Sequence, residues 1–110
     1  MWHNTTKSVF SRMQVELGVR KDVIAVAEDA DSAQAAAMSI RDEIEAYDHV
    51  DTARMLNSVT ATKRGGEHVV TAVDYAKFVN GRDKENGEAG FVEDGVNQAV
   101  LDGYDVRAVV

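Results

Sequence analysis

The chain contains no cysteine, and this absence removes several kinds of chemistry before any motif is considered. Without thiols there is no disulfide framework, no thiolate-bound zinc and no cysteine nucleophile. The length of 110 residues predicts a single domain over residues 1–110, because domains usually contain roughly 100 to 150 residues. So small a domain buries only about 60 to 70% of the surface that its unfolded chain exposes. Contacts between subunits or a well-filled core must therefore supply the remaining stability.

Long apolar runs are also missing. The first residues, Met1 to Lys7, contain no such run, and no segment approaches the roughly 20 apolar residues that a membrane span needs. The sequence thus predicts neither a signal peptide nor a membrane-spanning segment, and we expect no membrane partner.

Basic residues are in deficit, with 12 Lys and Arg against 19 Asp and Glu, which gives a formal net charge of -7. A field of this sign repels the phosphate backbone, so we expect no specific binding of nucleic acid. Hydrophobic residues make up 45% of the chain and charged residues 28%, proportions that are typical of a folded protein.

Residues that carry out catalysis or bind metals do not form a recognisable pattern. His3, His49 and His68 lack the close spacing that is typical of metal ligands. Asp42 belongs to the polar face of a predicted helix, where carboxylates usually maintain solubility. Ser58 lacks the glycine-flanked context of a catalytic nucleophile. We therefore predict a protein that is not an enzyme and that has no catalytic, cofactor or metal site.

The region from Lys21 to Tyr47 has apolar residues at the three-and-four spacing of one helix face, which predicts the main helix of the fold. A break is expected near residues 29–32, where Asp31 or Ser32 would cap a second helical segment. The region before this helix carries weaker signals. Alternating apolar residues over Met13 to Leu17 predict a short strand, and residues 1–12 are interpreted as an arm or a frayed start.

Two adjacent glycines, Gly65 and Gly66, separate two strand-like runs, residues 59–64 and residues 67–73. This pattern predicts a tight β-hairpin with a two-residue turn. The turn pairs Arg64 with Glu67, and this first pair sets the register of the two strands. One face then carries only apolar residues and is expected to be buried: Val59, Ala61, Val70 and Ala72. The other face carries Thr60, Thr62 and Thr71.

The segments around the hairpin complete the predicted order of elements. Asp51 is placed to cap a short helical turn over residues 52–57. After the hairpin, residues 81–90 are polar and contain three glycines, so we expect a mobile loop there. A closing helix is predicted from Phe91 onwards, followed by a short apolar end, Ala108 to Val110.

Two segments resemble the minor head-to-tail connector proteins, also called neck or tail-completion proteins, of long-tailed double-stranded-DNA bacteriophages. Val50 to Val59 is similar to that family's V-D-T-G-x-L-x-x-S motif followed by Ile or Val. Tyr75 to Asn80 resembles its Y-A-x-F/Y-V-E/N element, and Gly90-Phe91-Val92 resembles the step that opens its last helix. The likeness covers roughly residues 13–101. Ala53 stands where the family usually has glycine, and the proline that usually precedes the first motif is missing.

The resemblance implies a structural protein of the virion, assembled in the bacterial host cytoplasm. Copies of the chain would form a ring around the channel through which genomic DNA leaves, and the DNA would pass without specific binding. The other expected partners are the neighbouring head-completion and tail proteins. The motif residues are expected to be structural: Asp51, Thr52, Ser58, Tyr75, Phe78 and Phe91. Tyr75 and Phe78 would pack the hairpin against the helices.

The fold expected from these observations is α+β, with a long helix and a C-terminal helix packed on one side of a small antiparallel sheet. The sheet contains the hairpin and the strand at residues 13–17. The charged residues of the loop at 81–90 and the apolar residues at the carboxyl terminus are expected at subunit interfaces: Arg82, Asp83, Lys84, Glu85, Val109 and Val110.

Other functional readings remain, of which a small enzyme has the least support because catalytic motifs are absent. One is the tail-terminator ring protein, another phage ring component of similar size. Another is a small acidic binding protein, such as an antitoxin or an inhibitor that mimics nucleic acid. An inhibitor would be a monomer or dimer that binds a basic host protein, whereas a connector subunit would bind copies of itself or its virion neighbours.

Overall fold

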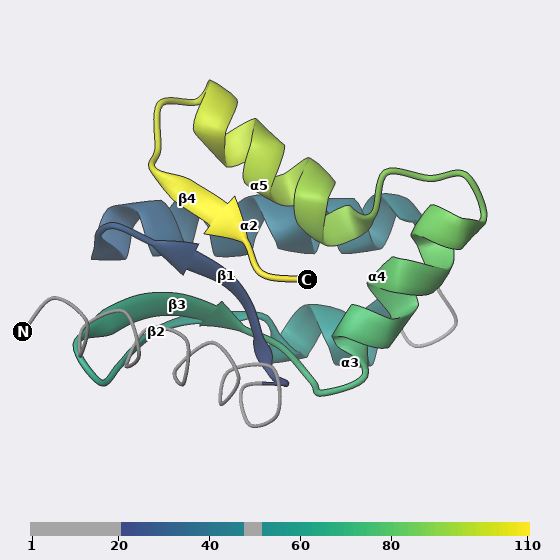
Figure 1. Ribbon diagram of the computed structural model, residues 1–110, viewed down its shortest axis with the longest axis horizontal. Coiled ribbons are helices and arrows are strands. Elements are labelled where there is room, and N and C mark those ends of the chain that lie inside the picture. The colour runs from purple at the N-terminus through teal and green to yellow at the C-terminus, as the bar shows by residue number, and fades with distance from the viewer. Residues whose placement is uncertain (1–20, 48–51) are drawn as a thin grey trace, which may run out of the picture.

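The computed structural model describes residues 21–47 and 52–110, and it has the predicted α+β architecture (Figure 1). The elements follow in the order β1 (Val23–Ala27), α2 (Ala30–Tyr47), α3 (Thr52–Ser58), β2 (Thr60–Arg64), β3 (Glu67–Thr71), α4 (Ala76–Glu85), α5 (Phe91–Leu101) and β4 (Val106–Ala108). The expected strand at residues 13–17, the expected arm at residues 1–12 and the expected cap Asp51 lie outside the described residues.

The four described strands form one antiparallel sheet in the order β2-β3-β1-β4. The hairpin has the predicted register, with Arg64 opposite Glu67 and Thr62 opposite Val69. Gly65 and Gly66 form its turn with φ angles of 59° and 80°. Both angles are left-handed, which matches the right-handed twist of the two strands and which glycine adopts without steric cost.

The predicted helix from Lys21 to Tyr47 is wrong in its first part, because residues Val23–Ala27 form strand β1 in the interior of the sheet. Four of its five residues are buried, including three in succession, so its sequence does not alternate and resembles a buried helix. Helix α2 begins only at Ala30. Its cap is Asp29, not Asp31 or Ser32, since the Asp29 carboxylate accepts a hydrogen bond from the Ser32 amide at 2.7 Å.

The end of the chain is part of the sheet. Strand β4 pairs with β1 on the side away from the hairpin, with Ala108 opposite Ala25. Beyond β4, the Val109 amide donates a hydrogen bond to the Ile24 carbonyl at 2.9 Å. The residues expected to form a short apolar end are therefore held by backbone hydrogen bonds, and β4 is a strand of the sheet that the sequence did not predict.

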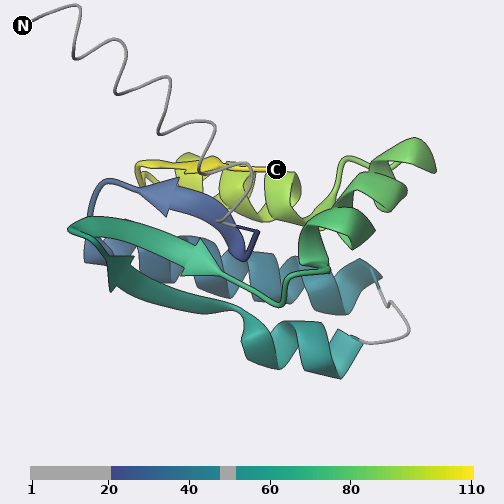
Figure 2. The same cartoon turned by 60° about the horizontal axis from the view of Figure 1, so that its bottom comes forward.

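The main core lies between the sheet and the two longer helices, α2 and α5, which pack on the same face of the sheet (Figure 2). The apolar face that was predicted for the hairpin is turned toward this core. Small residues on α2 let the helices approach closely. At Gly95 of α5, a Cβ atom would lie 2.6 Å from the Cα atom of Ile40. The core is made mainly of aliphatic side chains together with Phe91: Ile24, Ala36, Ala37, Ile40, Ile44, Met55, Val70, Phe91, Val92 and Ala99.

The expected loop over residues 81–90 is also wrong in part, because helix α4 continues to Glu85 and only residues 86–90 are non-helical. Arg82, Lys84 and Glu85 have high helix propensity, and Gly81 is tolerated within the helix. The polar composition and the glycines suggested a loop, although a short helix that is largely exposed has the same composition.

Two glycines in helices allow a direct test of the close helix packing. Gly95→Ala should destabilise the fold by about 1 to 3 kcal/mol, because the added methyl group overlaps the backbone at Ile40 and forces α5 away from α2. Gly81→Ala is the matched control. No atom lies within 4 Å of its added Cβ, so it should stabilise α4 by up to about 1 kcal/mol. Chemical denaturation measures both changes, and equal effects would contradict the packing argument.

Candidate functional site

The first motif segment forms the junction between helix α3 and the hairpin. The Ser58 hydroxyl donates a hydrogen bond to the Met55 carbonyl at 2.7 Å and accepts one from the Val73 amide at 3.0 Å. One side chain therefore joins the last turn of α3 to the second residue after the end of β3. Thr52 is the first residue of α3, and Met55 is buried in the core.

The second motif segment forms the start of helix α4. Tyr75 packs against the core, but its buried hydroxyl has no hydrogen-bond partner among the described residues. Ala76 is fully buried. Phe78, by contrast, is 70% exposed, so the expectation that it packs the hairpin against the helices is wrong. It lies on the outer face of α4, and the Arg82 guanidinium stands 6.0 Å from the centre of its ring.

Asn80, at the end of this segment, connects α4 to α5. It is 1% exposed, and its side-chain oxygen accepts a hydrogen bond from the Val92 amide at 2.9 Å. Its side-chain nitrogen donates to the Glu93 carboxylate at 2.7 Å. Gly90, at the N-cap position of α5, has no side chain that could accept a hydrogen bond from the first amides of the helix. Asn80 therefore caps the helix from a neighbouring element.

The start of α5 is held a second time, from the end of α2. The Tyr47 hydroxyl donates a hydrogen bond to Asp94 at 2.8 Å and accepts one from the Gly90 amide at 3.0 Å. The rings of Tyr47 and Phe91 meet edge to face, with 6.2 Å between their centres. Burial, followed by the hydrogen bond to Asp94, raises the pKa of the Tyr47 phenol well above its ordinary value. The phenol therefore remains a neutral donor at neutral pH.

Asn80, Tyr47 and Glu93 were not selected as site residues from the sequence. Asn80 is the last residue of the second motif segment, and its position just before a polar stretch and a new helix was the signal that the sequence offered. Tyr47 and Glu93 gave no such signal, since their partners lie on other elements. The selected residues Ser58 and Phe91 both lie at connections between elements.

The residues predicted for a subunit interface are in different environments. Arg82 and Glu85 are exposed. Lys84 forms an ion pair with Glu93 of its own chain at 2.8 Å, and Asp83 is only 8% exposed. The amide of Val109 is bound to β1, while Val110 is 52% exposed. Of this group, Arg82, Glu85 and Val110 are the residues most available to another molecule.

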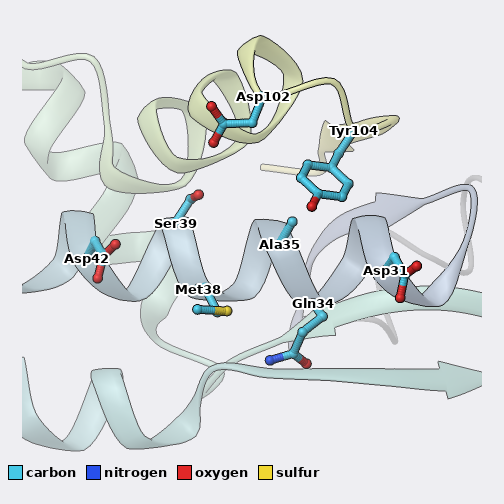
Figure 3. A pocket seen from close by; sticks show the side chains of 8 residues that line it. All are labelled: Asp31, Gln34, Ala35, Met38, Ser39, Asp42, Asp102 and Tyr104. Atoms are coloured by element: carbon cyan, nitrogen blue, oxygen red, sulfur yellow. The ribbon is translucent and has the colours of Figure 1, made fainter.

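A groove lies between helix α2 and the connection from α5 to β4 (Figure 3). Its volume is about 400 Å³. We call it the acidic groove, and its lining residues are Asp31, Gln34, Ala35, Met38, Ser39, Asp42, Asp102 and Tyr104. Its three carboxylates belong to exposed residues and form no ion pair within the described chain. Met38 and Tyr104 are 58% and 40% exposed, so the groove combines negative charge with accessible apolar surface.

Residues 21–47 and 52–110 contain no group of three or more His, Asp or Glu side chains arranged to hold a metal ion. No helix within these ranges has the length and apolar character needed to cross a membrane. Comparison of the chain with protein-family models, curated proteins and solved structures gives no match.

Substitution of Asn80 tests its role as a remote cap. Asn80→Ala should destabilise the protein by about 1 to 2 kcal/mol, because it leaves the buried Val92 amide without an acceptor. Thermal or denaturant unfolding provides the measurement. Tyr75→Phe is a suitable comparison, since it removes a buried hydroxyl that has no partner. It should leave the free energy of unfolding unchanged or slightly increased. A large loss of stability in this variant would show that the Tyr75 hydroxyl does have a partner.

The ion pair at Glu93 predicts a dependence of stability on pH. Partial burial raises the pKa of the Glu93 carboxyl, but hydrogen bonds from Lys84 and Asn80 outweigh it, and the pKa lies below the ordinary value of 4.5. A lowered pKa in the folded state stabilises the protein above the unfolded pKa, and this contribution is lost as the pH falls through the folded pKa. The difference in unfolding free energy between the wild type and Glu93→Gln should therefore be constant near neutral pH and shrink below about pH 4.5.

This comparison isolates Glu93 from other carboxyls. Burial raises the pKa of Glu43, which gives a contribution of the opposite sign, but Glu43 is present in both proteins and cancels in the difference. A difference that stays constant from neutral pH to about pH 3 would show that Glu93 is not the stabilising carboxylate.

Proposed function

We propose that the protein is a non-enzymatic structural subunit of the head-to-tail connector of a tailed bacteriophage. The observation that carries the proposal is that side chains from both motif segments form hydrogen bonds between neighbouring elements of the fold. Ser58 joins α3 to the hairpin, and Asn80 joins α4 to α5. Side chains that resemble the family's motifs thus hold consecutive elements together, as expected of motifs that maintain a fold and not a reaction.

The charge of the chain supports the same proposal. A subunit that surrounds a DNA channel must let the phosphate backbone slide past, and a net charge of -7 gives it no general attraction for DNA. In this proposal the subunits form a ring in the virion and also contact head-completion and tail proteins. A tail-terminator ring would share these properties and differ in its position along the virion axis.

One observation favours a second candidate, an acidic binding protein. The acidic groove presents three carboxylates with no ion-pair partner in the described chain, and such a surface would suit a basic host protein. The two candidates differ in their partners. A connector subunit is found in purified particles, whereas an inhibitor is found on a host protein and is absent from particles.

Deletion of the gene from the genome that carries it tests the proposal. The expected result is the accumulation of DNA-filled heads and separate tails in electron micrographs, with joining restored by the wild-type gene supplied in trans. Mass spectrometry of complemented particles should detect the chain. Normal joined particles from the deletion strain, or particles that lack the chain, would contradict a structural role in the connector.

A further inference from the structure

An exposed aromatic side chain and an arginine form a distinct feature on the outer face of α4. Phe78 is 70% exposed, and the Arg82 guanidinium lies over its ring, 6.0 Å from the centre. Arg82 forms no ion pair with another described residue. A single exposed apolar residue is normal on a protein surface. An aromatic side chain next to an arginine that has no ion-pair partner among the described residues is different, because aromatic residues and arginine are enriched at protein interfaces.

The acidic groove has the complementary chemistry. Asp31, Asp42 and Asp102 provide carboxylates for a guanidinium, a pairing that gives short, charge-assisted hydrogen bonds. Met38 and Tyr104 provide a thioether and a second ring, which both pack favourably against an aromatic side chain. Figure 3 shows Tyr104 on the opposite wall from the α2 residues, so an inserted side chain would contact both walls.

These two features lie on different parts of the chain. Helix α4 lies toward one end of α2, whereas the α5–β4 connection, with Asp102 and Tyr104, lies toward the other (Figure 1). A contact between the two features of different copies is therefore head to tail and not symmetric. Repetition of a head-to-tail contact produces a closed ring when the rotation between copies divides a full turn, and a filament otherwise.

We propose that the Phe78–Arg82 pair of one copy binds the acidic groove of the next copy, and that this contact forms the subunit interface. The inference rests on the proposed function, because it supplies the contact by which a ring would assemble. Arg82 meets the groove carboxylates, and the ring of Phe78 lies against Met38 and Tyr104. The contact brings a positive group of one copy to a groove of the next that is lined by negative groups, which opposes the repulsion between two copies of charge -7.

Two variants separate the two halves of this contact. The first, Phe78→Ser with Arg82→Glu, removes the inserted pair and leaves the groove intact. The second, Met38→Ser with Asp42→Arg, alters the groove and leaves the pair intact. All four side chains are exposed, so both variants should fold, and circular dichroism and thermal melting verify this.

Sedimentation velocity is measured for the full chain at concentrations up to about 1 mM, where even a weak interface is detected. The wild type should associate with increasing concentration, and each variant alone should have its association weakened by at least about tenfold. An equimolar mixture of the two variants should associate again, because the intact pair of the second variant binds the intact groove of the first.

Matched controls carry the same charge changes elsewhere. Lys63→Glu on β2 imitates Arg82→Glu, and Glu45→Arg on α2 imitates Asp42→Arg without lining the groove. Both should associate like the wild type. Loss of association in these controls would show that net charge, and not the proposed contact, controls assembly, and this would overturn the inference.

Other results also decide the question. Association of the wild type that persists in both variants would overturn the proposed contact but leave the connector function standing. A wild type that stays monomeric at about 1 mM would overturn the inference as well, and deletion of the gene would still test the function independently. A groove that binds a basic host protein, in place of a second copy, would contradict both proposals.

Discussion

The close contact between helices α2 and α5 is the constraint on which the rest of the structure depends. Gly95 permits it, since a larger residue would overlap the backbone at Ile40. Once α5 lies on α2, the short connection after Leu101 brings β4 beside β1. The sheet thus obtains its fourth described strand, and the carboxyl-terminal residues become part of the fold.

The first residues of α5 must be held in place so that Gly95 lies opposite Ile40 of α2. Asn80 and Tyr47 both act there, from two different elements. Their hydrogen bonds satisfy backbone amides that a helix cannot satisfy by itself. The buried polar groups around α5 thereby have a structural purpose.

The contrast between interior and surface supports a protein that works by assembly. The side chains of the two motif segments that form hydrogen bonds do so within the chain. Charged side chains without an ion-pair partner among the described residues have opposite signs on two surfaces. Arg82 lies on α4, and three aspartates line the acidic groove. Such a division suits repeated contacts between identical subunits, because each copy carries both halves of the contact.

The sequence by itself determined the α+β class, the hairpin with its register and the closing helix at Phe91, because these follow from local glycine turns and apolar periodicity. It did not determine that residues 23–27 form a strand, since a strand buried at successive positions has no alternation. Nor did it place Asn80 at the start of α5 or leave Phe78 exposed. Those outcomes depend on which elements meet in space, and only the tertiary structure decided them.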